Sequence, residues 1–216
     1  MLARALAITF LTALPAAAQP VTVAALGDSL TQGYGLPQRA GLVPQLQAWL
    51  RDRGADVTLV NAGVSGDTTA GGLGRAAWTL TPEVDGLIVA LGGNDLLRGI
   101  DPAVTRANLS GILDAARDAD VDAMLIGIEA PANYGGDYRR AFNAIYTDLA
   151  AAYDIPVIPS MLAGVMAAPQ PRALMQPDGI HPNARGVKAV VEAIGPSVLA
   201  FVDSLGACDG GCIAAR

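Results

Sequence analysis

The sequence predicts an α/β fold in which helices flank a five-stranded parallel sheet. Three observations lead to this prediction: short apolar runs recur along the chain, helical patterns lie between them, and no linker, repeat or low-complexity stretch divides the chain. The runs are continuous rather than alternating, as expected for strands that are buried on both faces. Strands that alternate with helices form right-handed βαβ units and hence a parallel sheet. A chain of 216 residues is long enough to form one domain with a sizeable core.

The apolar runs are the predicted strands. In chain order they cover residues 21–26, 57–60, 87–91, 123–128 and 155–158. Parallel strands bring their carboxyl ends to one edge of the sheet, and ligands bind outside that edge. Residues that directly follow these runs are therefore the first candidates for a functional site.

Apolar residues at helical spacing predict four helices between and after the strands. The first helix ends before Gly54, and the last begins near Gly186. We expect the aromatic residues on these helices to lie in the core rather than at a ligand site. The apolar stripes are Leu42, Leu46, Trp49 and Leu50; Val104, Leu109, Ile112 and Leu113; Phe142, Ile145, Leu149 and Tyr153; and Val190, Ile194, Val198 and Phe201.

Residues 1–18 have the pattern of a secretory signal peptide. Residues 1–4 form a short basic start, residues 5–14 are apolar but too few to span a bilayer, and residues 15–18 supply small side chains at a cleavage-like position. We expect export to the periplasm or the cell exterior, with cleavage near Ala18; the alternative is an uncleaved N-terminal anchor. No later stretch is expected to be long and apolar enough to span a membrane, so stable membrane insertion after cleavage is not expected.

The rest of the chain is expected to form one domain over residues 19–206, followed by a tail over residues 207–216. The tail holds both cysteines, Cys208 and Cys212, which an oxidising compartment would allow to close a small disulfide loop; the alternative is two free thiols. Two cysteines and a distant histidine do not make a tetrahedral metal site. The formal net charge of −6 and the absence of a basic cluster argue against a nucleic-acid partner.

Four short segments follow strands or precede the last helix. Each segment alone indicates only a turn or a helix cap. Four of them in this order indicate one functional site. They are residues 27–35 (GDSLTQGYG), 61–68 (NAGVSGDT), 91–95 (LGGND) and 177–183 (PDGIHPN).

The single histidine of the chain, His181, limits the chemistry of such a site. A serine nucleophile needs an adjacent general base, and imidazole suits that task near neutral pH. Ser29, directly after the first strand, is the candidate nucleophile, and Asp178 is near enough in sequence to orient His181. Residues 72–77 match a dinucleotide-binding pattern but do not directly follow a strand, so no nucleotide cofactor is expected. Three other aspartates, expected to cap helices or support the site, are Asp28, Asp67 and Asp95.

The four segments resemble the sequence blocks of the SGNH, or GDSL, hydrolases. They are most similar to the periplasmic thioesterase, lysophospholipase and arylesterase group, which residues 131–135 (PANYG) also resemble, and the likeness covers essentially the whole mature chain. The resemblance implies a three-layer α/β/α sandwich of the flavodoxin-like type. It also implies a catalytic triad of Ser29, His181 and Asp178.

The resemblance further implies an oxyanion hole and an acyl site. The oxyanion donors would be the backbone N–H groups of Ser29 and Gly66 and the side-chain amide of Asn94. Gly66 has no side chain to block the approach of its backbone, and Asn94 donates without adding charge. The substrate-binding residues would be Leu97, Asn133 and Tyr134, on the loops that border the acyl site.

The expected function is a serine esterase that acts on aryl or acyl esters, with lysophospholipids and acyl thioesters as further substrates. Its expected partner is a small-molecule ester or lipid, it needs no cofactor or metal, and it is expected to be a monomer. One alternative is a carbohydrate acetylesterase of the same family. The other is a non-catalytic lipid- or glycan-binding protein, for which the loss of a triad residue would be expected.

Overall fold

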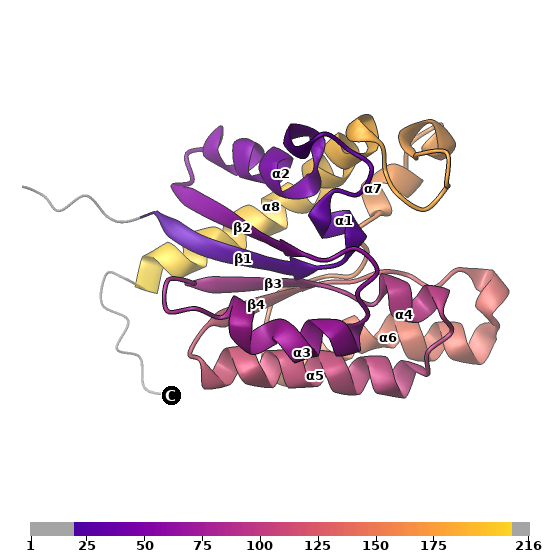
Figure 1. Cartoon of the computed structure of the whole chain (residues 1–216), viewed down its shortest axis with the longest axis horizontal. Coiled ribbons are helices and arrows are strands. Elements are labelled where there is room, and N and C mark those ends of the chain that lie inside the picture. The colour runs from indigo at the N-terminus through magenta and orange to yellow at the C-terminus, as the bar shows by residue number, and fades with distance from the viewer. Residues whose placement is uncertain (1–19, 209–216) are drawn as a thin grey trace, which may run out of the picture.

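The computed structural model describes residues 20–208 and contains a parallel sheet with the strand order β2-β1-β3-β4-β5 (Figure 1). This order is the flavodoxin-like one, and it confirms the predicted fold class. Each apolar run of the sequence corresponds to one strand. The strands are β1 (Val21–Gly27), β2 (Val57–Gly63), β3 (Gly86–Ala90), β4 (Asp122–Ile126) and β5 (Val157–Ile158).

Helices cover both faces of the sheet and make the two outer layers. On one face lie α2 (Leu42–Arg51) and α8 (Ala184–Cys208); on the other lie α3 (Thr69–Thr79), α5 (Pro102–Asp118) and α6 (Gly136–Tyr153). Each layer buries its own apolar cluster against the sheet. The shorter elements are α1 (Ser29–Gln32), α4 (Gly93–Leu97), α7 (Ala163–Met166) and the 3₁₀ turns η1 (Gln38–Ala40), η2 (Ala132–Tyr134) and η3 (Pro171–Leu174).

The four predicted helices are present as α2, α5, α6 and α8, but α3 was not predicted. Its sequence contains three glycines, which are poor helix formers, and few large apolar residues. The helix forms because the Thr68 side chain caps it and because it packs on α5. Tertiary packing thus overrides a weak local preference.

Two strands differ in length from the prediction by more than one residue. The strand β5 has only two residues, where residues 155–158 were expected. Pro156 lacks the N–H group that a ladder hydrogen bond requires, so the strand begins after it. The strand β2 instead continues to Gly63, and its full length pairs with β1.

The helix α8 contradicts the expectation that no later stretch is long and apolar enough to span a membrane. Its stretch of 23 residues from Ala184 to Gly206 contains an 18-residue window with a mean hydropathy of 1.5, which meets that test by length and composition. Val190, Ile194 and Val198 are buried in the same cluster as α2 and the strands. The apolar composition of α8 is therefore explained by its place as a core helix.

Two predictions concern residues outside the described part of the chain. The signal peptide falls within residues 1–19, and Cys212 falls within residues 209–216. The cleavage site and the disulfide therefore stay predictions. The backbone of α8 runs to Cys208, two residues past the expected end of the domain.

The strand order fixes where a site forms. From β1 the chain passes to β2 on one side, and β3 then pairs on the other side of β1. Such a reversal leaves a crevice at the carboxyl ends of β1 and β3. Residues 28–29 follow β1, and residues 93–95 begin α4 shortly after β3. The fold thus brings the first and third polar segments to the same crevice.

Candidate active site

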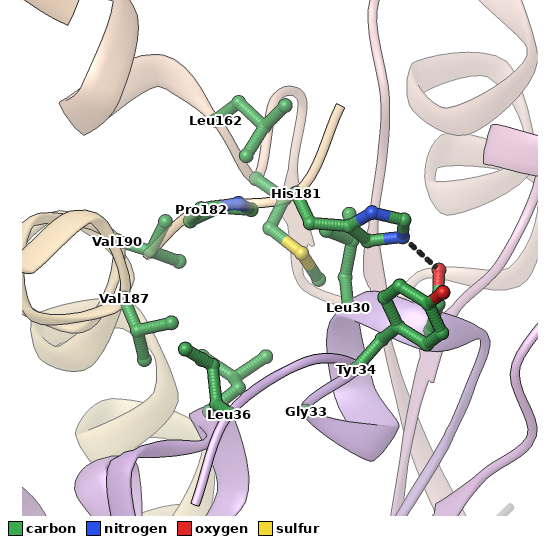
Figure 2. Close-up of a pocket in the computed structure, with 12 residues that line it drawn as sticks. Leu30, Gly33, Tyr34, Leu36, Leu162, His181, Pro182, Val187 and Val190 are labelled. Carbon is green, nitrogen blue, oxygen red and sulfur yellow. Dashed lines mark hydrogen bonds between the residues drawn. The ribbon is translucent and has the colours of Figure 1, made fainter. Parts of the chain in front are cut away.

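Ser29, His181 and Asp178 form a continuous chain of hydrogen bonds. Ser29 is the first residue of α1, and its Oγ lies 2.8 Å from Nε2 of His181. The other ring nitrogen of His181, Nδ1, lies 2.7 Å from Oδ2 of Asp178. The dashed line in Figure 2 marks the contact between His181 and the serine hydroxyl. The structure therefore brings together three residues that the sequence places up to 152 positions apart.

The surroundings of Asp178 fix the tautomer of His181. Oδ1 of Asp178 accepts hydrogen bonds from the backbone N–H groups of His181, at 3.0 Å, and Ile180, at 2.9 Å. These hydrogen bonds, with the one from the His181 ring, lower the pKa of Asp178 to about 2. An ionised carboxylate can only accept, so Nδ1 carries the proton of a neutral ring. Nε2 is then free to accept the hydrogen bond that the Ser29 hydroxyl donates.

A second carboxyl group, that of Asp28, is buried next to Ser29 in the chain. Asp28 is only 3 % exposed, and its Oδ1 caps α1 by accepting the backbone N–H of Leu30 at 3.0 Å. Burial raises the pKa of Asp28 to about 6, with smaller increases from Asp67 and Asp95. The Leu30 hydrogen bond and the attraction of His181 oppose that increase. The sequence predicted the capping role but not a carboxyl that titrates near neutral pH.

Two of the three expected oxyanion donors have free backbone N–H groups. Among residues 20–208, neither the N–H of Ser29 nor that of Gly66 donates a hydrogen bond. Gly66 has a φ of 84°, a left-handed conformation that favours glycine. Its carbonyl accepts a hydrogen bond from Arg98 at 2.7 Å, which holds the adjoining peptide unit between Gly66 and Asp67.

The side-chain amide of Asn94 donates to the backbone carbonyl of Asp67 at 2.8 Å. An amide has two N–H groups, so one remains for a ligand. The N-cap of α4 is Gly92, and Asn94 lies inside the helix. Asn94 therefore does not cap this helix. Its bond to Asp67 instead holds the third polar segment against the second.

Sequence analysis missed Arg75, which lies in the segment that matched a dinucleotide pattern. Arg75 is on α3, and its Nε pairs with Asp67 at 2.7 Å. Its other two nitrogens donate to the carbonyls of Ala62, at 2.6 Å, and Gly27, at 2.8 Å. One guanidinium thus joins the ends of β1 and β2 to the loop that carries Gly66. The only signal in the sequence is an arginine eight residues after an aspartate, which would fit many helices.

The remaining carboxylate of the motifs, Asp95, is fully buried and supports α3. It accepts hydrogen bonds from the backbone and hydroxyl of Thr69 and from the hydroxyl of Thr105. Within residues 20–208, no group of three or more histidine, cysteine, aspartate or glutamate side chains is arranged to hold a metal ion.

The predicted substrate-binding residues lie on two neighbouring loops. Leu97 ends α4 and is exposed, while Asn133 and Tyr134 belong to η2. Tyr138 connects these loops, because its ring stacks on Tyr134 at 5.5 Å and its hydroxyl donates to the carbonyl of Ile100 at 2.8 Å. No hydrogen bond or ring contact among the described residues joins Leu97, Asn133 or Tyr134 to the triad. Their contact with substrate stays a prediction.

A small apolar pocket borders Ser29 and His181 (Figure 2). Ser29 and His181 form part of its wall, and the ring of Tyr34 lies 4.7 Å from the ring of His181. No sequence pattern predicts this pocket, since its walls come from segments that are distant in the chain. Further lining residues are Leu36, Met161, Leu162, Val187 and Val190.

Comparison with known proteins extends over the whole site. The sequence profile of the GDSL-like lipase/acylhydrolase family matches residues 25–189. Esterase TesA of Pseudomonas aeruginosa is 40 % identical over 199 residues, which are 92 % of this chain and 96 % of that protein. Thioesterase 1/protease 1/lysophospholipase L1 of Escherichia coli K12 is 41 % identical over 169 residues, 77 % of this chain and 78 % of that protein.

A solved structure supports the same relationship. The crystal structure of AlinE4, an SGNH-hydrolase family esterase, superimposes with a TM-score of 0.71 at 42 % sequence identity. The superposition covers 85 % of this chain and 97 % of that one.

Proposed function

This chain belongs to the GDSL-like lipase/acylhydrolase family and is a serine ester hydrolase, and we propose that Ser29, His181 and Asp178 are its catalytic triad. The observation that carries this proposal is the unbroken hydrogen-bond chain from the Ser29 hydroxyl through both ring nitrogens of His181 to Asp178. A nucleophile, its base and the group that orients the base are the three parts that acyl transfer needs.

In the first half of the reaction, the Ser29 Oγ attacks the carbonyl carbon of the ester. Nε2 of His181 takes the hydroxyl proton as the new C–O bond forms, and Asp178 stabilises the resulting imidazolium. The tetrahedral intermediate then collapses, and His181 gives the proton to the departing oxygen or sulfur. This step leaves an acyl group on Ser29 and a neutral His181.

In the second half, water replaces the leaving group. His181 removes a proton from the water as its oxygen attacks the acyl carbon, and returns that proton to Ser29 when the acid departs. Both halves pass through an oxyanion. The free N–H groups of Ser29 and Gly66 and the second amide hydrogen of Asn94 are the proposed donors to it.

The proposed substrates are esters with an apolar acyl or aryl part, including lysophospholipids and acyl thioesters. The apolar pocket beside Ser29 and His181 supports this choice, because a sugar would leave its hydroxyl groups without partners on such a wall. The exposed apolar side chain of Leu97 and the aromatic pair of Tyr134 and Tyr138 are the proposed borders of the acyl site.

A substrate profile tests this assignment. Purified protein would be assayed with p-nitrophenyl esters of increasing acyl length, with acyl-CoA thioesters, with lysophospholipids and with acetylated sugars. We expect kcat/KM to rise from acetate toward longer acyl chains and to be low for acetylated sugars. A preference for acetylated sugars over every apolar ester would instead establish the carbohydrate acetylesterase. If the protein hydrolyses none of these substrates, the non-catalytic binding protein would be favoured.

We also propose that the enzyme works outside the cytoplasm. The basic start, the short apolar stretch and the small residues before Gln19 support this proposal. Protein isolated from the native host should begin near Gln19. Recovery of the chain with Met1 intact from the cytosol would contradict export.

A further inference from the structure

Asp178 and His181 belong to one short hairpin, here called the histidine hairpin and defined as residues 174–183. Met175 and Pro182 form an isolated antiparallel bridge, and the N–H of Gln176 donates to the carbonyl of His181 at 2.7 Å. The hydrogen bonds between Asp178 and His181 lie inside this loop. The acid and the base are therefore held together locally, whatever happens at Ser29.

Ser29 lies on a separate segment, here called the nucleophile segment and defined as residues 28–41. Within the described part of the chain, two hydrogen bonds connect this segment to the histidine hairpin. One is the catalytic contact between Ser29 and His181. The other is donated by the side-chain amide of Gln176 to the carbonyl of Tyr34 at 2.8 Å.

The residues that Gln176 connects are themselves bonded to Ser29 or adjacent to His181. On one side, the N–H of Tyr34 donates to the carbonyl of Ser29 at 3.0 Å. On the other, the same amide nitrogen of Gln176 donates to the carbonyl of Pro182 at 3.0 Å, next to His181. The Gln176 side chain thus connects Tyr34, which is hydrogen-bonded to Ser29, to Pro182, which follows His181 in the chain.

Gly35 leaves the space that this link requires. Its φ is 72°, and a Cβ at this position would lie 2.3 Å from the side-chain oxygen of Gln176. An alanine at position 35 would force the Gln176 amide to move, in addition to the cost of a left-handed backbone. The close packing of Gln176 against the nucleophile segment therefore depends on a residue without a side chain.

We propose that Gln176 is a positioning residue that docks the histidine hairpin on the nucleophile segment and so sets the distance between Ser29 and His181. The inference rests on the proposed roles of those two residues. A proton-transfer pair must be within hydrogen-bond reach, and a misplacement of about 1 Å can cost about 10²-fold in rate. The contact between the Tyr34 and His181 rings is apolar and less directional, so it does not replace the Gln176 hydrogen bond.

The alternative is that Gln176 only stabilises the hairpin itself, through its bond to Pro182. The two roles differ in what happens to the bond between Asp178 and His181. If Gln176 docks an intact hairpin, that bond survives the loss of the Gln176 amide while the reactivity of Ser29 falls. If Gln176 holds the hairpin together, both are lost at the same time.

The test uses Gln176→Met, which keeps the length of the side chain but removes its donors. The matched control is Gln170→Met, because Gln170 is exposed on a neighbouring loop and its side chain makes no hydrogen bond among the described residues. For each protein one would measure kcat, KM, the rate of covalent modification by an alkyl fluorophosphonate, and the downfield proton NMR signal of the His181 Nδ1–H. Gly35→Ala displaces the same Gln176 side chain by a change in the nucleophile segment, and it replaces Gln176→Met if that variant does not fold.

We expect Gln176→Met to lower kcat and the modification rate together by about 10- to 10²-fold, with KM changed less than about twofold. The downfield signal should persist, and Gln170→Met should behave as wild type. Wild-type rates in Gln176→Met, or loss of the downfield signal together with activity, would overturn the inference. A wild-type protein whose Ser29 does not react would contradict the proposed triad itself, which is a different result.

Discussion

Arg75 on α3 and Asp67 form an ion pair at 2.7 Å that joins this helix to the loop carrying Gly66. The pair is mostly sheltered, with side-chain exposures of 22 % and 19 %. Because the same guanidinium also donates to the carbonyls of Gly27 and Ala62, it fixes the ends of two strands relative to one proposed oxyanion donor, Gly66. The relative position of Ser29 and Gly66 therefore depends on a residue that touches neither.

Arg75→Lys should lower both stability and activity. A lysine ammonium is a point charge on a flexible stem and does not reproduce the planar geometry of three directed hydrogen bonds. Each lost hydrogen bond from the charged guanidinium costs about 1.5–3 kcal/mol, although the Gly27 carbonyl keeps the N–H of Val64 as a partner. Thermal unfolding and kcat measure the two effects. The control is Arg106→Lys, in an exposed pair with Asp148, where the change should be about 1 kcal/mol or less. Equal effects of the two substitutions would show that Arg75 is an ordinary surface residue.

Asp28→Asn should stabilise the protein at neutral pH. The pKa of Asp28 is about 6 in the folded protein, above the ordinary value of 3.8, so between these values the folded state binds the proton more tightly than the unfolded state. Stability therefore falls as pH rises through this range and stays lower above it. Asparagine is uncharged and still caps α1. We expect a gain of roughly 1–3 kcal/mol at pH 7 that shrinks toward pH 4.

The control for Asp28 is Asp101→Asn, which changes an exposed capping aspartate at the start of α5. Denaturant unfolding of both variants and the wild type at pH 4, 5.5 and 7 gives the comparison. A pH-dependent gain should occur in Asp28→Asn and be absent in Asp101→Asn. Destabilisation of Asp28→Asn at pH 7 would mean that the charge of Asp28 makes a favourable contact in the folded protein.

His181 must be neutral to accept the Ser29 proton, so kcat/KM should fall on the acid side with a slope of one. Asp178 does not contribute to this limb, because its pKa is about 2. The limb should persist in Asp28→Asn if it reports His181 rather than the buried carboxyl. If this acid-side fall in kcat/KM disappears in Asp28→Asn, the ionisation belongs to Asp28.

Asp178→Asn should lower kcat by about 10⁴-fold, because an amide would stabilise the wrong tautomer of the His181 ring.

Asn94→Ala separates stabilisation of the oxyanion from support of the loop. Loss of an oxyanion donor should lower kcat by about 10²–10³-fold, with a small change in KM. Loss of the bond to the Asp67 carbonyl should cost about 0.5–1.5 kcal/mol of stability. Asn108→Ala is the control, since Asn108 makes a similar bond, to the Thr69 hydroxyl. Near-normal kcat in Asn94→Ala with a lower melting temperature would remove Asn94 from the proposed mechanism.

The sequence was sufficient to predict the sheet and the candidate triad. Continuous apolar runs identify strands buried on both faces, and such runs are a local property of the chain. Ser29 and His181 were identified because their surrounding motifs and the single histidine leave few choices. The hydrogen-bond chain that joins these residues agrees with that choice.

The features that the sequence did not predict depend on tertiary contacts. Gln176 looks like a loop residue, and only the fold brings its amide to the carbonyl of Tyr34. The pKa of Asp28 depends on burial, which no motif reports. The sequence predicted the apolar stripe of α8 but underestimated its length and apolar content, which are those of a long core helix.

The most direct test of the central claim is to identify the serine that reacts. The protein would be treated with an alkyl fluorophosphonate, digested, and analysed by mass spectrometry, with Ser29→Ala and Ser65→Ala treated in parallel. Ser65 is the informative comparison, because it lies in the second motif and its hydroxyl donates to Gln32 rather than to a histidine. The account predicts a single adduct, on Ser29, which also forms in Ser65→Ala. In Ser29→Ala both the adduct and ester hydrolysis should be absent. An adduct on Ser65, or full hydrolysis by Ser29→Ala, would contradict it.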